Sequence, residues 1–220
     1  MTIVAVIGWI ATATGMTLGI PQLVRLARTR RVDGLSLIGM QAVVSMNIGW
    51  MMHGIRIGQP PQAIASGVSL LTVLPTVILL SRALGRRTST TLLPSFALAA
   101  VMIAIDQFIG SSAYGSFALI PMVIALGGQT LALVRSHHVL GVSTPTLILG
   151  SINQGLWTVW AFLVVDSGTM ISTTMASIFV VFNGVWYVLR RTGLRAFFPY
   201  PQDVSAAPTL VSACPQVVEA

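Results

Sequence analysis

The chain contains no lysine, a single cysteine and only five acidic residues among its 220 positions. Without lysine it cannot form the Schiff base that holds the chromophore of seven-helix retinal proteins. The one cysteine, Cys214, excludes an intramolecular disulfide and a cysteine-based metal cluster. Photochemistry through a Schiff base and thiol redox chemistry are therefore excluded.

Charged residues of both signs make up only 8% of the chain, whereas 55% of the residues are hydrophobic and the mean hydropathy is +0.86. A water-soluble domain of this length cannot bury so much apolar surface, so lipid must cover it. We therefore predict an all-α integral membrane protein in contact with a lipid bilayer.

Seven apolar runs are long enough to serve as membrane spans, because crossing the hydrocarbon layer takes about 20 helical residues. Charged residues or Gly/Pro clusters bound each run. We place the spans at about 4–26, 35–55, 61–81, 92–110, 114–134, 143–165 and 169–189. The proline-rich segment 192–220 is expected to be a disordered cytoplasmic tail.

The net charge of +7 would suggest a nucleic-acid partner in a soluble protein, but all twelve basic residues are arginines beside apolar runs. The basic stretches carry few aromatic residues for base stacking, so we expect no nucleic-acid binding. Eleven arginines fall in alternate connections, and the opposite connections hold only Arg56, Asp106 and Asp166. Because arginine concentrates on the cytoplasmic side, this predicts a multi-pass protein of the cytoplasmic membrane with its N-terminus outside and its C-terminus in the cytoplasm.

An internal repeat appears when the chain is shifted against itself by 107 residues. The shift places Gln22 on Gln129, Gly34 on Gly141 and Trp50 on Trp157 without a gap. It relates spans 1–3 to spans 5–7 and leaves span 4 as a linker helix, so both three-helix bundles are parallel. We predict four segments: a first bundle (1–82), a basic loop with the linker helix (83–112), a second bundle (113–191) and the tail (192–220).

The two halves carry a paired motif, IPQLVRLARTRRVDGLS and GGQTLALVRSHHVLGVS. Together they resemble the motifs of the PQ-loop family, and the segments that follow look like the sugar-transporting SWEET and SemiSWEET branch. The resemblance implies alternating access by two three-helix bundles, with the motif proline as a hinge. Pro21 and Gln22 match the motif in the first half, and Gly128 and Gln129 stand at the equivalent positions in the second.

In that branch a Trp and an Asn of each half bind the sugar, which points to Trp50 and Trp157 here. The two Asn positions hold Ser66 and Thr173 instead, and a hydroxyl offers fewer hydrogen bonds than an amide. Each Trp could also be an ordinary residue of the membrane interface. Because the two Trp residues coincide under the 107-residue shift, we predict a substrate pocket with these four residues.

Asn47 and Gln154 coincide under the 107-residue shift, one turn before each Trp. They would add an amide to each wall of the predicted pocket. Hydrogen bonding between helices is the alternative interpretation of these two amides.

Coupled transport needs an ionisable group in the membrane. The candidates His53, Arg56, Asp106 and Asp166 all fall at the outer ends of spans, which favours facilitated diffusion. We interpret His53 as a residue at the mouth of the pathway with no coupling role.

No hydrolase motif or metalloprotease motif occurs in the sequence, so we expect no enzyme, no catalytic residue, no metal and no cofactor. The predicted function is facilitated diffusion of a small polar solute, with a sugar as the first candidate. An exporter of amino acids or another metabolite with the same fold is the alternative, and a non-transporting scaffold or receptor is a second one. The sequence leaves a homo-oligomer open.

Overall fold

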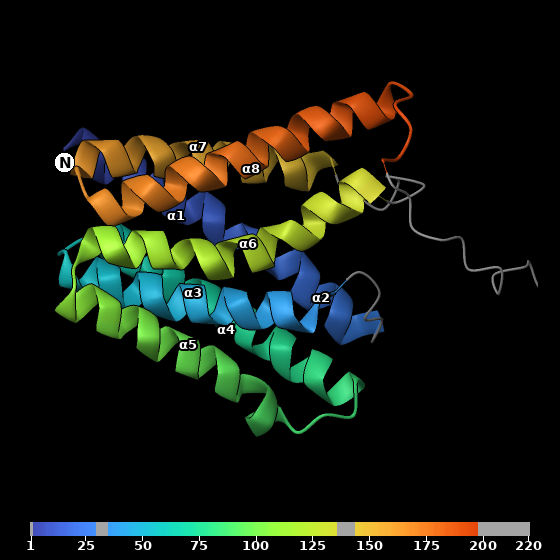
Figure 1. The fold of residues 1–220 in the computed structure, drawn as a ribbon, viewed down its shortest axis with the longest axis horizontal. Coiled ribbons are helices and arrows are strands. Elements are labelled where there is room, and N and C mark those ends of the chain that lie inside the picture. The colour runs from blue at the N-terminus through green and yellow to red at the C-terminus, as the bar shows by residue number, and fades with distance from the viewer. Residues whose placement is uncertain (1, 30–34, 136–143, 198–220) are drawn as a thin grey trace, which may run out of the picture.

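A computed structural model describes residues 2–29, 35–135 and 144–197. Every regular element in these ranges is a helix (Figure 1). The eight helices are α1 (Ile3–Leu18), α2 (Ile20–Thr29), α3 (Leu37–Arg56), α4 (Pro60–Ala83), α5 (Thr88–Phe108), α6 (Ser111–Arg135), α7 (Thr144–Val164) and α8 (Ser167–Arg191).

The first span is broken into α1 and α2 at Gly19. Pro21 explains the break, because proline has no backbone N–H and its ring blocks the carbonyl four residues earlier, that of Thr17. If α1 and α2 are counted together as one broken rod, the described residues form seven helical rods. This confirms the predicted all-α fold. Each predicted span overlaps one rod, and the ends differ by only a few residues.

Six of the rods are long and apolar enough to cross a membrane by length and composition, namely all except α3. Helix α3 carries polar residues along its length, among them Gln41, Ser45, Asn47 and His53. It packs against α4, α5 and α6, so these neighbours rather than lipid receive its polar groups. Helix α3, the remaining predicted span, is therefore shielded inside the bundle.

The two halves have the same helix arrangement. In the first, α4 packs against both α1 and α3; in the second, α8 packs against both α6 and α7. Moved along by 107 residues, Leu37–Arg56 covers 144–163 and Pro60–Ala83 covers 167–190, which nearly coincide with α7 and α8. The predicted pair of parallel three-helix bundles is confirmed.

The halves meet at two equivalent contacts, α1 against α7 and α3 against α6. In both cases the first helix of one half packs on the second helix of the other. The linker helix α5 lies outside this interface and packs on α3, α4 and α6. The space between the halves is consequently bounded by six helices and not by α5.

The molecule has two chemically different ends (Figure 1). Arg25, Arg28, Arg82–Arg87, Arg135 and Arg190–Arg195 lie at the end where α2, α4, α6 and α8 finish, here called the arginine end. The opposite end, here called the acidic end, holds Arg56, Asp106 and Asp166. Large apolar side chains are exposed between them, Leu71 and Val181 for example, as expected of a surface that faces lipid. Which end faces the cytoplasm stays a prediction.

Some helices pack very closely at the acidic end. A Cβ built on Gly115 of α6 would lie 2.3 Å from the backbone oxygen of Gly168 on α8, and one on Gly8 would lie 3.0 Å from Pro61 Cβ. Gly8 and Pro61 are the equivalents of Gly115 and Gly168 under the shift. Small residues therefore allow close helix packing at the same place in both halves.

The basic connection residues His137 and His138 and most of the predicted tail, from residue 198 on, lie outside the described residues. The short described part of the tail turns back on the bundle, and the Phe197 N–H donates to the carbonyl oxygen of Val134 at 2.9 Å.

Candidate solute-binding site

A cavity of about 360 Å³ lies between the two halves. Its walls come from α1, α3 and α4 of the first half and from α6, α7 and α8 of the second. Its volume lies within the range of about 300–1,000 Å³ typical of small-molecule sites. The cavity is lined by Gly15, Val43, Met46, Asn47, Trp50, Gln62, Ala65, Ser66, Ser69, Met122, Ala125, Leu126, Gln154, Trp157, Thr169, Ser172, Thr173 and Ala176.

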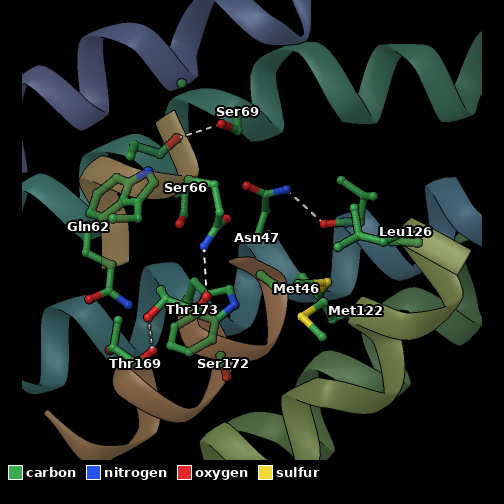
Figure 2. Close-up of a pocket in the computed structure, with 18 residues that line it drawn as sticks. Met46, Asn47, Gln62, Ser66, Ser69, Met122, Leu126, Thr169, Ser172 and Thr173 are labelled. Atoms are coloured by element: carbon green, nitrogen blue, oxygen red, sulfur yellow. Dashed lines mark hydrogen bonds between the residues drawn. The ribbon is translucent and has the colours of Figure 1, made fainter. Parts of the chain in front are cut away.

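All six side chains predicted for the substrate pocket lie on this wall, namely Asn47, Trp50, Ser66, Gln154, Trp157 and Thr173. Figure 2 shows Asn47 and Ser66 of the first half facing the same space as Thr173 of the second. Their contact with a substrate stays a prediction, but the structure brings all six together.

The lining follows the internal repeat closely. Beyond the three predicted pairs, the 107-residue shift relates Gln62 to Thr169, Ala65 to Ser172 and Ser69 to Ala176 across the cavity. Both halves thus contribute equivalent positions with different side chains. All the lining residues are uncharged, so the cavity suits a neutral polar molecule better than an ion.

The two predicted amides of the wall, Asn47 and Gln154, each donate one or two hydrogen bonds. Asn47 Nδ2 donates to the Val43 carbonyl oxygen at 2.8 Å. Gln154 Nε2 donates to the Thr173 carbonyl oxygen at 3.1 Å and to Thr158 Oγ1 at 3.4 Å. Within the described part of the chain neither amide oxygen accepts a hydrogen bond, which leaves both as acceptors for a hydroxyl group.

Gln62 is one of the polar wall residues that sequence reasoning missed, together with Thr169 and Ser172. Its side chain is only 5% exposed, yet its Oε1 has no hydrogen-bond partner among the described residues. A buried acceptor without a partner is costly, and a polar solute in the cavity would satisfy it. Its place one turn before Ser66 on α4 could have identified it.

Both predicted tryptophans lie in the interior of the bundle. Trp50 meets the rings of Tyr114 and His53 edge-on, with centroids 4.8 Å and 5.5 Å away. Trp157 meets Trp160 edge-on at 5.3 Å. Because these contacts fix the indole rings at the cavity wall, their location fits the pocket interpretation rather than the membrane-interface one.

The predicted hinge residues differ between the halves. Pro21 stands at the break between α1 and α2, and Gln22 Nε2 contacts Met40 Sδ at 3.3 Å. Helix α6 runs without interruption through Gly128, although Figure 1 shows it curving over its second half. The side chain of Gln129 lies outside the described residues. Between the two motifs as the structure describes them, only the first thus has a helix break, at Gly19 beside Pro21. Hinge motion at either position stays a prediction.

A buried ionic network lies between the cavity and the acidic end of the molecule. His53 Nδ1 is 2.9 Å from Asp106 Oδ2, and His53 Nε2 is 2.9 Å from Asp166 Oδ2. Arg56 donates to both oxygens of Asp106, at 2.8 and 2.6 Å. The His53 ring also stacks on Tyr114 with centroids 4.7 Å apart.

The interpretation of His53 as a mouth residue is wrong, because its side chain is 0% exposed. The sequence places it correctly at the outer end of its span, but Asp106, Asp166 and Tyr114 come from other parts of the chain and close over it. Its burial depends on tertiary contacts that span spacing does not reveal.

Asp166 is held as an acceptor by its surroundings. Burial alone would raise the pKa of its carboxyl, but hydrogen bonds from His53, Ser111 and Thr169 outweigh that effect and hold the pKa well below its usual range. Ser111 Oγ donates at 2.6 Å, and the Thr169 N–H at 2.8 Å, which makes Asp166 the N-cap of α8. Asp166 therefore stays ionised at physiological pH.

Comparison with known families matches residues 3–63 to the model of the PQ loop repeat. Within the first half of the chain, residues 3–63 are therefore similar to a PQ loop repeat. The match covers α1, α2 and α3 and reaches the first residues of α4, including Pro21, Asn47 and Trp50. The protein is thus a multi-pass membrane protein whose first half contains a segment similar to a PQ loop repeat.

No curated protein and no solved structure matches the chain. The second half, which lies beyond the matched PQ loop repeat, is related to the first by its helix arrangement and by the 107-residue shift.

Proposed function

We propose that the protein is a transporter that carries a small neutral polar solute down its gradient by alternating access, with a sugar as the first candidate. The observation that carries this proposal is the cavity, which lies between two equivalent bundles and has equivalent residues on its two walls. In a transporter built from repeats, the substrate site lies at the repeat interface.

The chemistry of the wall supports a sugar. Trp50 and Trp157 offer flat apolar faces on which the C–H face of a sugar ring can stack. Asn47, Gln62 and Gln154 offer amide oxygens to hydroxyl groups. A sugar needs both kinds of contact and no counter-charge.

An amino acid exporter is supported less well, because a zwitterion would enter a cavity whose lining carries no charged side chain. A scaffold would not need a cavity of this size, and a receptor would not need one whose two walls carry equivalent positions. The proposed SWEET-like function therefore fits the site better than either alternative.

The test is uptake of radiolabelled sugars and amino acids into proteoliposomes that contain the purified protein. We expect at least one neutral sugar to equilibrate across the membrane. Failure of every neutral solute in a broad panel, with folded protein in the vesicles, would overturn the proposal in favour of a scaffold.

The pocket assignment is tested by the double variant Trp50→Ala/Trp157→Ala. Each lost aromatic contact is worth about 0.5–1.5 kcal/mol, so uptake should fall roughly tenfold or more while the protein remains folded. Trp9→Ala is the matched control, because Trp9 is 38% exposed and does not line the cavity. Normal uptake by the double variant contradicts the assignment.

A further inference from the structure

We propose that His53, Asp106 and Asp166 form a proton-binding site that holds the acidic end of the protein closed. The proposal rests on the proposed function only where it concerns flux. The proposal goes beyond the proposed function because it gives the protein a second ligand, the proton, bound outside the solute cavity.

The geometry of His53 requires a proton on each ring nitrogen. Both nitrogens lie 2.9 Å from a carboxylate oxygen, Asp106 on one side and Asp166 on the other. A carboxylate only accepts hydrogen bonds, so each nitrogen must donate, and a neutral imidazole has a single N–H. The closed arrangement therefore contains the imidazolium form.

The charges facing His53 lead to the same conclusion. Arg56 on its own helix, Asp106 on α5 and Asp166 at the start of α8 are the charged groups around it, and Tyr114 on α6 is the titratable neighbour that stacks on its ring. Within the described residues, the one charged side chain on α4 is Arg82, which lies at the opposite end of the helix. One arginine, two carboxylates and an imidazolium sum to zero, whereas a neutral imidazole would leave a buried net charge of −1.

Loss of the proton would break a contact between the halves. His53 belongs to the first half, and Asp166 lies between α7 and α8 of the second. Without a proton on Nε2, a nitrogen lone pair would face the Asp166 oxygen, and the two would repel. Since the closed state binds one more proton than a state with this contact broken, low pH favours closure and high pH favours opening.

The site is joined directly to the solute cavity. Trp50 of the cavity wall lies edge-on against His53, and Thr169 of the wall donates through its N–H and its hydroxyl to the Asp166 oxygen that faces His53. Separation of His53 from Asp166 would therefore move two wall residues. Proton binding and solute binding should influence each other, and by equal factors.

The experiment measures closure by electron paramagnetic resonance, with spin labels at Ile55→Cys and Phe162→Cys in a Cys214→Ser background. Both positions are exposed, by 59% and 52%, and lie at the acidic ends of the equivalent helices α3 and α7. We expect a short distance near pH 5 and a growing population of longer distances toward pH 9, because the closed state holds the additional proton. For one proton, the closed-to-open ratio changes by at most about tenfold per pH unit.

His53→Gln should abolish the pH response, because Gln does not titrate. The double variant His137→Gln/His138→Gln is the matched control: it removes the chain's other two histidines and should keep the response. An unchanged distance between pH 5 and pH 9 in the parent overturns the proposal. A response that persists in His53→Gln overturns it as well.

Asp166→Asn provides a second variant in case His53→Gln does not fold. Asn is as good an N-cap as Asp, and its amide can donate to a neutral His53 Nε2. We expect the distance to stay short at both pH values. A pH response equal to that of the parent would contradict the assigned role of Asp166.

Flux is measured separately, in proteoliposomes at the same pH values. A pH-dependent distance without any solute flux would overturn the proposed transport function and leave the proton site standing. Solute flux together with a spin-label distance that does not respond to pH would overturn the proton site and leave the proposed transport function standing.

Discussion

At the scale of single residues, the two halves use the same turn with different amino acids. Gly58 in the first half and Val165 in the second are equivalent under the 107-residue shift, and both have left-handed backbones, with φ of 66° and 60°. Glycine adopts this conformation freely, whereas for a β-branched residue it is strained. The strained position directly precedes Asp166, so the turn fixes the carboxylate that meets His53.

Val165→Gly should therefore stabilise the protein. The left-handed conformation costs a non-glycine residue about 1–2 kcal/mol, and Val165 is 75% exposed, so little packing is lost. We expect a rise in melting temperature of about 2–4 °C, measured in detergent. Val159→Gly removes the same atoms from an exposed site inside α7 and should lower the melting temperature instead.

The six predicted pocket residues could be named from sequence on two grounds. The family resemblance pointed to Trp50, Trp157, Ser66 and Thr173, and the 107-residue shift paired Asn47 with Gln154. Neither feature pointed to Gln62, because its equivalent under the shift is Thr169, a different residue type. The environment of His53 could not be predicted, because its partners lie 53 and 113 residues away. A contact over such a separation depends on how the helices pack.

At the scale of helices, close packing depends on glycine at a few positions. Gly115→Ala would place a Cβ 2.3 Å from the Gly168 backbone oxygen, and a backbone cannot move aside as a flexible side chain can. We expect a loss of roughly 1–3 kcal/mol or more, as for other overpacked sites. Thermal unfolding in detergent would measure this loss.

Gly127→Ala is the matched control on the same helix, because a Cβ there meets no atom within 4 Å. Alanine favours a helix over glycine by about 0.5–1 kcal/mol, so this variant should be equally or more stable. An equal loss in both variants would show that α6 and α8 do not pack as described.

The helices themselves could be predicted well, since long apolar runs bounded by Arg, Gly and Pro mark membrane spans with few alternatives. The break at Gly19 follows from Pro21. The order of packing, with α4 and α8 each between the other two helices of its half, could not be predicted from span positions. It depends on which small residues meet, as Gly115 and Gly168 do.

At the scale of the whole molecule, the arginine end is predicted to face the cytoplasm. In a Cys214→Ser background, Ser112→Cys lies at the acidic end and Thr192→Cys at the arginine end, and both sites are exposed. A membrane-impermeant maleimide should label Ser112→Cys in intact cells and Thr192→Cys only after the membrane is opened. The opposite labelling pattern would reverse the predicted topology.

The ionic network occupies only one of the two equivalent contacts between the halves. The position equivalent to His53 is Trp160, which packs against Gly8 across the α1–α7 contact. A symmetric dimer of the first half would instead place each His53 near Ile7 and Gln59 of the other copy, because these are the equivalents of Tyr114 and Asp166. Neither residue carries a carboxylate. A chain with two unlike halves can thus hold a single sensor off its symmetry axis, and its pH response should follow one proton, without cooperativity.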